Sequence, residues 1–176
     1  MAWPASAGSG RWPGRASIAS ASRSPAGSAA ATLLARSGRD VVLADHMAFP
    51  RDKTCGDGLI PDAHAALKRL GVLDEVMARA HRVRHVACIG PAGGRVDVPG
   101  ELAVMPRREL DEIVCGAAVR AGARMYAPAS YESPLQDDTG RVVGAVLSHE
   151  GQRREVQAAW TVLATGAAAQ PLVAAG

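Results

Sequence analysis

The residue types and spacing of a nucleotide site occur between Pro25 and Asp45. The segment "PAGSAAATLLARSG" begins with proline, continues with good helix formers and ends at Gly38, so it predicts a helix. "DVVLAD" then predicts a short buried strand that ends in Asp45. A helix N-terminus attracts a pyrophosphate, a glycine there lets the backbone come close, and an acid ending the next strand accepts hydrogen bonds from an adenosine ribose.

Gly27 and Asp45 fit that chemistry, because Asp45 follows Gly27 by 18 residues. Together they predict one half of a parallel βαβ unit. A second interpretation stays open for each residue. Gly27 would also serve close helix packing, and an aspartate after a strand would also serve as a turn residue or helix cap.

The charge distribution argues against a nucleic-acid partner. The formal net charge is +3, but residues 1–24 hold three arginines and no acid, and residues 25–176 hold 17 basic and 17 acidic side chains. A neutral body without a basic stripe is not typical of a phosphate-backbone binder. No apolar run approaches the roughly 20 residues of a membrane span, so we expect a cytoplasmic protein with at most peripheral membrane contact.

The cysteines and histidines do not have the spacing of a metal site. Three cysteines occur without a C-x-x-C pair, and the five histidines share no ligand spacing. We therefore predict no disulfide framework and no metal.

The remaining patterns predict an α/β fold, a Rossmann-like parallel sheet with a β-meander. Helical patterns cover residues 64–71, 72–80 and 107–122, and a hairpin covers 83–99. Strand-like segments at 123–133, 141–149 and 153–166 predict the meander, followed by a final buried strand, Thr161–Ala164.

The first 24 residues differ in composition from the rest. They are mainly Ala, Ser, Gly, Arg, Pro and Trp, with Ile18 as the one β-branched residue, which predicts a disordered tail. The alternative is a poor first strand at Ala16–Ser22. Serines stand at positions 22 and 24, where a phosphate loop would carry glycines.

Three motifs give the sequence a family resemblance. "FPRDKTCGDG", "MPRRELD" and "VLATGA", together with the segment from Pro25 to Asp45, resemble the geranylgeranyl reductase family of FAD-dependent oxidoreductases. That family belongs to the flavoproteins with a para-hydroxybenzoate-hydroxylase-like fold. The resemblance covers residues 25–176 and about the first half of a typical member. Because it ends abruptly before Pro25, we hypothesise that residues 1–24 are translated in a wrong reading frame.

The resemblance implies FAD as the cofactor and assigns a place beside it to several residues. Pro25, Ala26 and Gly27 would face the pyrophosphate, and Asp45 would face the adenosine ribose. Lys53, Cys55 and Gly56 would lie beside the flavin, and Arg107 would approach the ribityl and phosphate region. Ala129 and Ser130 would contact the adenine, and Gly166 would lie in the A-T-G turn. Cys55 is the one catalytic candidate, although shape and polarity beside the flavin are its expected role.

The resemblance also implies a reaction, the reduction of isoprenoid double bonds in a prenyl lipid with NAD(P)H or another reductant as electron donor. Residues 25–176 would form a partial FAD-binding domain in which residues 83–98 begin a substrate-side region. We expect this chain to be inactive alone, because of the serines in the phosphate loop and because it stops soon after "VLATGA". Two alternatives remain: an FAD-dependent aromatic monooxygenase or halogenase, and a non-functional fragment without cofactor.

Overall fold

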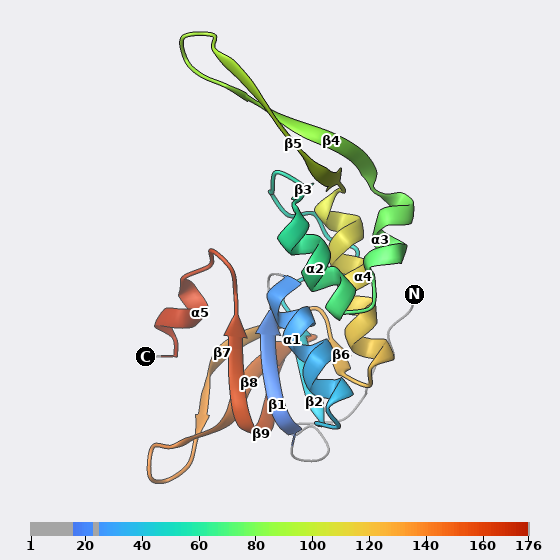
Figure 1. The fold of residues 1–176 in the computed structure, drawn as a ribbon. Coiled ribbons are helices and arrows are strands. Elements are labelled where there is room, and N and C mark those ends of the chain that lie inside the picture. The colour runs from blue at the N-terminus through green and yellow to red at the C-terminus, as the bar shows by residue number, and fades with distance from the viewer. Residues whose placement is uncertain (1–15, 23–24, 176) are drawn as a thin grey trace. The chain divides into compact units, whose positions relative to one another are not determined.

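The structure is a computed structural model that describes residues 16–22 and 25–175. It divides into two compact units, the first formed by residues 1–49 and 115–176 and the second by residues 50–114. We refer to these as unit 1 and unit 2 (Figure 1).

Unit 1 contains the predicted βαβ arrangement. Strand β1 (Ala16–Ser22) leads into helix α1 (Pro25–Arg36), which returns the chain to β2 (Val41–Asp45). β1 pairs with β2 in parallel, and β2 pairs in parallel with β6 (Arg124–Tyr126). The predicted α/β class, with helix and buried strand in this order, is confirmed.

The strand at Ala16–Ser22 corrects the prediction of a disordered tail for that segment. β1 lies in the middle of the six-stranded sheet, whose order is β6-β2-β1-β9-β8-β7. Ladder partners on both sides can compensate for a weak strand propensity, because β propensity depends strongly on tertiary context. The rest of the predicted tail, residues 1–15 and 23–24, lies outside the described residues.

The predicted meander is formed by β7 (Ala129–Gln136), β8 (Val142–His149) and the first part of β9 (Gln152–Ala164). The prediction of a separate, buried final strand at Thr161–Ala164 is wrong. β9 is continuous: up to Gln157 it pairs antiparallel with β8, and from Ala158 it pairs in parallel with β1. Residues 161–164 are half-buried rather than buried. The short helix α5 (Gln170–Val173) follows.

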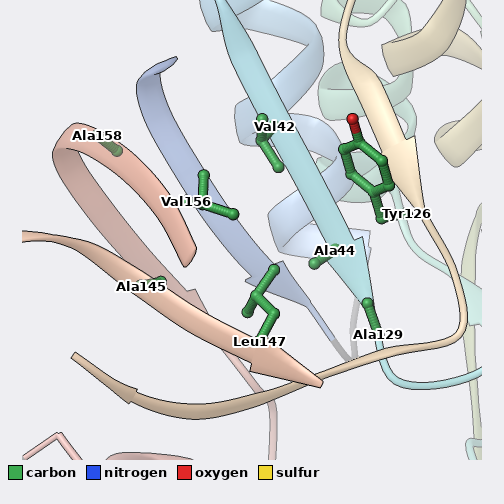
Figure 2. Close-up of a cluster of buried hydrophobic side chains, with 8 residues drawn as sticks. All are labelled: Val42, Ala44, Tyr126, Ala129, Ala145, Leu147, Val156 and Ala158. Carbon is green, nitrogen blue, oxygen red and sulfur yellow. The ribbon is translucent and has the colours of Figure 1, made fainter. Parts of the chain in front are cut away.

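Two apolar clusters pack against opposite faces of β2. Val41 and Leu43 face Ala31 of α1 and Cys115 of helix α4 (Arg107–Arg120). Figure 2 shows the other face, where Val42 and Ala44 meet side chains of β6 and the meander. This second cluster also contains Tyr126, Ala129, Ala145, Leu147, Val156 and Ala158. β2 is therefore buried on both faces, as expected for an inner parallel strand.

Unit 2 contains the predicted hairpin. Its elements are β3 (Gly58–Leu59), α2 (Pro61–Arg69), α3 (Leu73–Arg79), β4 (His81–Ile89) and β5 (Arg95–Val104), followed by the first part of α4. The three strands pair antiparallel in the order β3-β5-β4. Most residues of β4 and β5 are exposed, including Val86, Ile89, Val96 and Val98.

Candidate functional site

The candidate residues of unit 1 gather at one edge of its sheet. Strand register places Ser22, Asp45 and Ala164 side by side at the carboxyl ends of β1, β2 and β9. Helix α1 begins three residues after Ser22, so its N-terminus belongs to this edge. A nucleotide could not bridge Asp45 and the start of α1 if they lay at opposite ends of the sheet. They lie at the same end, so the arrangement is compatible with such a nucleotide.

Four further residues, Ala129, Ser130, Thr165 and Gly166, follow the strands that end at this edge. Ala129 and Ser130 follow β6, whose Tyr126 is paired with Ala44 near the end of β2. Ala129 is buried and Ser130 is exposed. Gly166 follows β9 with a φ of 62°, in the left-handed region that glycine adopts without strain. The neighbouring Thr165 hydroxyl donates a hydrogen bond to the Ala168 carbonyl at 3.0 Å.

Asp45 is engaged within the chain. The residue is only 1% exposed, and its Oδ1 accepts a hydrogen bond from the Met47 amide at 3.1 Å. The same oxygen lies 3.3 Å from Nδ1 of His46. The structure thus supports both interpretations made from the sequence: Asp45 is at the expected edge, and it also caps the turn after its strand.

The start of α1 is partly accessible. Ala26 is exposed and Pro25 half-buried, while Gly27 is buried with Ser28 on the face that packs inward. Within the helix, the Thr32 hydroxyl donates a hydrogen bond to the Ser28 carbonyl at 2.8 Å. Gly27 therefore has the packing environment that its second interpretation predicted, beside a helix end open to solvent.

Unit 2 holds the other four candidate residues around the loop before β3 and the start of α4. Lys53 and Arg107 line an open cavity of about 380 Å³. Its other lining residues are Asp52, Thr54, Asp57, Pro106 and Arg108. Cys55 and Gly56 lie in the same loop and are exposed. The cavity therefore presents both cations and carboxylates.

A buried ion-pair network supports this cavity. Nε and Nη2 of Arg107 donate to the two carboxylate oxygens of Asp111 at 2.8 and 3.0 Å. Nη1 of Arg51 lies 3.1 Å from Oδ2 of the same carboxylate, and the side chains of Arg51 and Asp111 are each 2% exposed. A carboxylate between two guanidinium groups satisfies most of its hydrogen-bonding capacity, which a buried charge requires.

Asp57 ties the loop to α4. Its Oδ1 accepts a hydrogen bond from the amide of Arg107, the first residue of the helix, at 3.3 Å. Its carbonyl accepts from the Met105 amide at 3.0 Å. Asp57 has a φ of 55°, a conformation that aspartate tolerates better than most residues. An arginine in the first turn of a helix interacts unfavourably with the helix dipole. In α4 this arginine, Arg107, is compensated by its ion pair with Asp111.

The pKa of the Cys55 thiol is lowered from its ordinary value. The backbone of Asp57 contributes most to this lowering and the Arg107 guanidinium next, while burial opposes it. For Arg107, burial favours the neutral form, but the bonds to Asp111 and Cys55 outweigh it and raise the pKa. Hydrogen bonding and positive charge favour a thiolate, the nucleophilic form of cysteine.

Sequence reasoning missed Arg51, Asp57 and Asp111. Asp111 had a local signal, because it lies four residues after Arg107 and such pairs meet on a helix surface. Arg51 and Asp57 lie in the motif "FPRDKTCGDG", but their contacts to α4 join residues 60 and 50 positions apart in sequence, which no local pattern indicates.

Seven of the eleven predicted cofactor residues belong to unit 1 and four to unit 2. Within unit 1 the structure brings its seven to one sheet edge, and within unit 2 it gathers its four around one loop and the start of α4. Their contact with FAD stays a prediction. A second cavity of about 550 Å³, lined by Tyr131, Arg141, Trp160, Thr161 and Leu163 among others, contains none of the eleven.

The described residues contain no group of three His, Cys, Asp or Glu side chains arranged to hold a metal ion. Among the same residues, no helix has the length and apolar character needed to cross a membrane.

Comparison with known proteins identifies the family. The model of the FAD binding domain family matches residues 23–171. A menaquinone reductase of Mycolicibacterium smegmatis is 39% identical over 142 residues, which cover 76% of this chain and 34% of that protein. Digeranylgeranylglycerophospholipid reductase 2 of Methanopyrus kandleri is 33% identical over 143 residues, covering 81% of this chain and 35% of that protein.

A solved structure supports the fold. The myxobacterial FAD-dependent chondrochloren halogenase superposes with a TM-score of 0.80 at 23% identity, covering 88% of this chain and 38% of that one. The chain spans about a third of the length of the curated relatives it matches, rather than the half expected from the resemblance. The chain belongs to the FAD binding domain family, its cofactor is FAD, and its relatives include geranylgeranyl-lipid reductases.

Proposed function

We propose that this chain is the FAD-binding part of a flavin-dependent reductase that saturates isoprenoid double bonds of a prenyl lipid. The observation that carries the proposal is the nature of the two relatives. One is named for menaquinone and the other for a digeranylgeranyl glycerophospholipid, and both compounds carry polyisoprenoid chains. The prenyl chain is thus the chemistry that both substrates share.

Residues of unit 1 would bind the ADP portion of FAD. The amide groups at the start of α1 and the backbone of Pro25, Ala26 and Gly27 would hold the pyrophosphate. Asp45 would hold the ribose through an acceptor at the end of β2, and Ala129 and Ser130 would contact the adenine. Gly166 would let the backbone approach the cofactor after β9.

Residues of unit 2 would serve the flavin portion. A Cβ atom added at Gly56 would meet nothing within 4 Å, and Gly56 is not among the glycines with positive φ. Neither packing nor backbone conformation therefore requires a glycine at this position. A ligand that comes close to the backbone would require it. Lys53 and Arg107 offer cations to phosphate or flavin oxygens beside it.

The chemistry comes from the cofactor, since reduced flavin supplies a hydride from N5 and NAD(P)H or another reductant restores it. The chain's residues bind and orient. Cys55 adds a polar thiol at the loop, and Arg107 adds a positive charge held by Asp111. An aromatic monooxygenase or halogenase is the second candidate, favoured by the fold similarity to the halogenase.

A chimera tests the proposal. Residues 23–171 of this chain replace the matching segment of the Mycolicibacterium smegmatis menaquinone reductase, and the protein is purified with FAD. We expect stoichiometric flavin and, with reductant and a geranylgeranyl lipid under anaerobic conditions, a product heavier by two hydrogens per reduced double bond. A chimera carrying Arg107→Ala is the matched control, with weaker flavin retention.

Three results would contradict the proposal. A chimera that holds flavin but leaves the prenyl lipid unreduced would exclude this reductase function. Oxygenation or halogenation of an aromatic acid by that chimera would favour the second candidate. A folded chimera without flavin would favour a non-functional fragment.

A further inference from the structure

Strand β9 of unit 1 changes its partner partway along its length, and this change leaves part of one edge unpaired. Up to Gln157 it pairs with β8, and from Ala158 onward it pairs with β1. β1 and β8 lie on opposite sides of β9 in the strand order. Within the part of the chain that the structure describes, residues 158–163 therefore have a neighbouring strand on the β1 side and none on the β8 side. Such an edge presents unpaired N–H and C=O groups to another chain.

The cavity of about 550 Å³ in unit 1 follows this unpaired edge. Its lining includes Ala159, Trp160 and Thr161 of β9. Successive residues of a strand point to opposite faces of the sheet, so a cavity that touches all three lies at the edge of the strand and not on one face. The other walls come from β7, the start of β8 and the segment after α5, and include Tyr131, Val142 and Ala175.

The side chains at this edge suit an apolar polypeptide segment. Trp160 is 73% exposed, and Val142 is exposed as well. The buried Thr161 hydroxyl has no hydrogen-bond partner among the described residues, and a buried hydroxyl normally has one. Addition of a strand to an open edge answers these features together, because main-chain hydrogen bonds supply affinity and pockets accept alternate side chains.

The relatives indicate a source for such a strand. The segments matched to this chain make up 34% and 35% of the two reductases, so about two thirds of each lies outside the match. The family match ends at residue 171, and Ala175 lines the cavity. The polypeptide beyond the match therefore begins beside the unpaired edge.

A second copy of this chain fits the edge less well. In a two-fold dimer the same surface of both copies would have to meet itself. The walls from β7, β8 and Ala175 stand beside the edge, so it can receive an inserted strand more readily than another recessed edge. A two-fold contact would also bring Arg141 of both copies together, although no carboxylate lines the cavity.

We propose that the unpaired edge of β9, together with its cavity, binds one extended strand of the polypeptide that makes up the remaining two thirds of these relatives. The bound strand pairs with residues 158–163 through its backbone and places alternate side chains against Trp160 and Thr161. This surface belongs to unit 1 alone, and the inference does not depend on the proposed reaction.

A peptide scan tests the proposal. Short overlapping peptides labelled with fluorescein cover the part of the Mycolicibacterium smegmatis menaquinone reductase outside the match, and fluorescence anisotropy measures their binding to this chain. We expect a contiguous group of peptides to bind. Trp160→Lys should weaken this binding about tenfold or more, because a lysine at an edge opposes pairing with another strand. Val96→Lys, on the hairpin of unit 2, is the matched control, since Val96 is 64% exposed, and it should bind like the wild type.

Backbone methylation of the binding peptide separates strand addition from simple apolar contact. Successive amides of an extended strand point to opposite edges, so only every second one faces β9. One series of alternately N-methylated peptides should bind like the parent, and the other should fail to bind. Hydrogen exchange of residues 158–163 should slow when the parent peptide is bound. Equal loss of binding in both series would contradict pairing through the backbone.

Three further results would overturn the proposal. The first is that no peptide binds the folded wild-type chain, and the second is binding that survives unchanged in Trp160→Lys. The third is a concentration-dependent dimer in light scattering that Trp160→Lys abolishes, which would assign the edge to a second copy. Circular dichroism checks that each variant folds. Val142→Lys, on the opposite wall of the cavity, is a second variant that should also weaken peptide binding if Trp160→Lys disturbs folding.

Discussion

Strand β2 of unit 1 and hairpin β4–β5 of unit 2 both contain apolar residues but place them in opposite environments. All five residues of β2 are buried, with helices on one face and the meander on the other. The hairpin exposes apolar side chains over most of its length, with Ile89 at 69%, although Ala103 near the end of β5 is buried. Burial stabilises in proportion to the apolar area removed from water. The contrast therefore predicts that apolar substitutions matter in β2 and hardly at all in the hairpin.

The two units also use charge differently. Unit 2 buries a carboxylate between two arginines, whereas the ion pairs of unit 1 include the half-exposed pair of Arg124 with Asp40. Breaking a buried pair leaves an uncompensated charge, while an exposed pair contributes little. Unit 1 is thus held by its apolar layers, and unit 2 adds a polar network at its candidate site.

The largest expected effect tests the burial contrast directly. Leu43 is 0% exposed, so Leu43→Ala should lower the free energy of unfolding by about 2–5 kcal/mol through lost transfer energy and a residual cavity. Ile89→Ala in the hairpin should change it by less than about 0.5 kcal/mol. Urea unfolding followed by far-ultraviolet circular dichroism measures both. Equal losses for the two variants would contradict the contrast.

The next effect sharpens the description of unit 1. A Cβ at Gly144 of β8 would collide with the Val156 carbonyl oxygen of β9. The two strands can keep this approach only with glycine, so Gly144→Ala should destabilise the chain by about 1–3 kcal/mol through overpacking. Gly140→Ala is not a neutral control, because Gly140 has a φ of 82°. Gly56→Ala is the better control, since its Cβ meets nothing, and it should unfold like the wild type without FAD.

Much of the fold could be predicted from local signals. The limits of α1 followed closely from Pro25, the helix formers after it and Gly38. The apolar run before Asp45 identified β2. The hairpin followed from alternation around "GPAGG". These features depend on residues close in sequence, for which propensity and turn chemistry are informative.

What could not be predicted depends on partners far along the chain. Ala16–Ser22 has a poor strand sequence, yet it pairs with β2 on one side and with β9 on the other. β9 changes its pairing from β8 to β1 between Gln157 and Ala158, and no glycine, proline or other turn residue in the sequence indicates this change. The Arg51–Asp111 pair likewise joins a loop to a helix. The pattern identified Arg107 and Cys55 through the resemblance, but the ion pairs that hold the Arg107 side chain needed the structure.

A third effect, smaller in energy, concerns the network of unit 2. Charged hydrogen bonds contribute roughly 1.5–3 kcal/mol, so Arg107→Ala should weaken FAD binding about tenfold or more. Arg108→Ala is the matched control, because Arg108 is exposed and lines the same cavity. Titration of flavin fluorescence measures the dissociation constant. An unchanged value in Arg107→Ala would leave Arg107 with a structural role only.

The smallest effect tests an exposed carboxylate in unit 1 against the buried one of unit 2. Oδ1 of Asp137, in the turn between β7 and β8, accepts hydrogen bonds from the Thr139 hydroxyl at 2.6 Å, the Thr139 amide at 3.0 Å and the Arg141 amide at 3.1 Å. These bonds, those from Thr139 first, lower the pKa of Asp137 below its ordinary value. A lowered native pKa contributes stability above the unfolded value, about 3.9, and that stability is lost as the pH falls through the native value. The difference in thermal midpoint between wild type and Asp137→Asn should therefore be constant near neutral pH and shrink below about pH 4.

Asp138→Asn, next in the turn, controls for net charge. A difference that grows on acidification would contradict the assigned direction. The effect should be far smaller than that of breaking the buried Arg51–Asp111 pair, because solvent screens the exposed group.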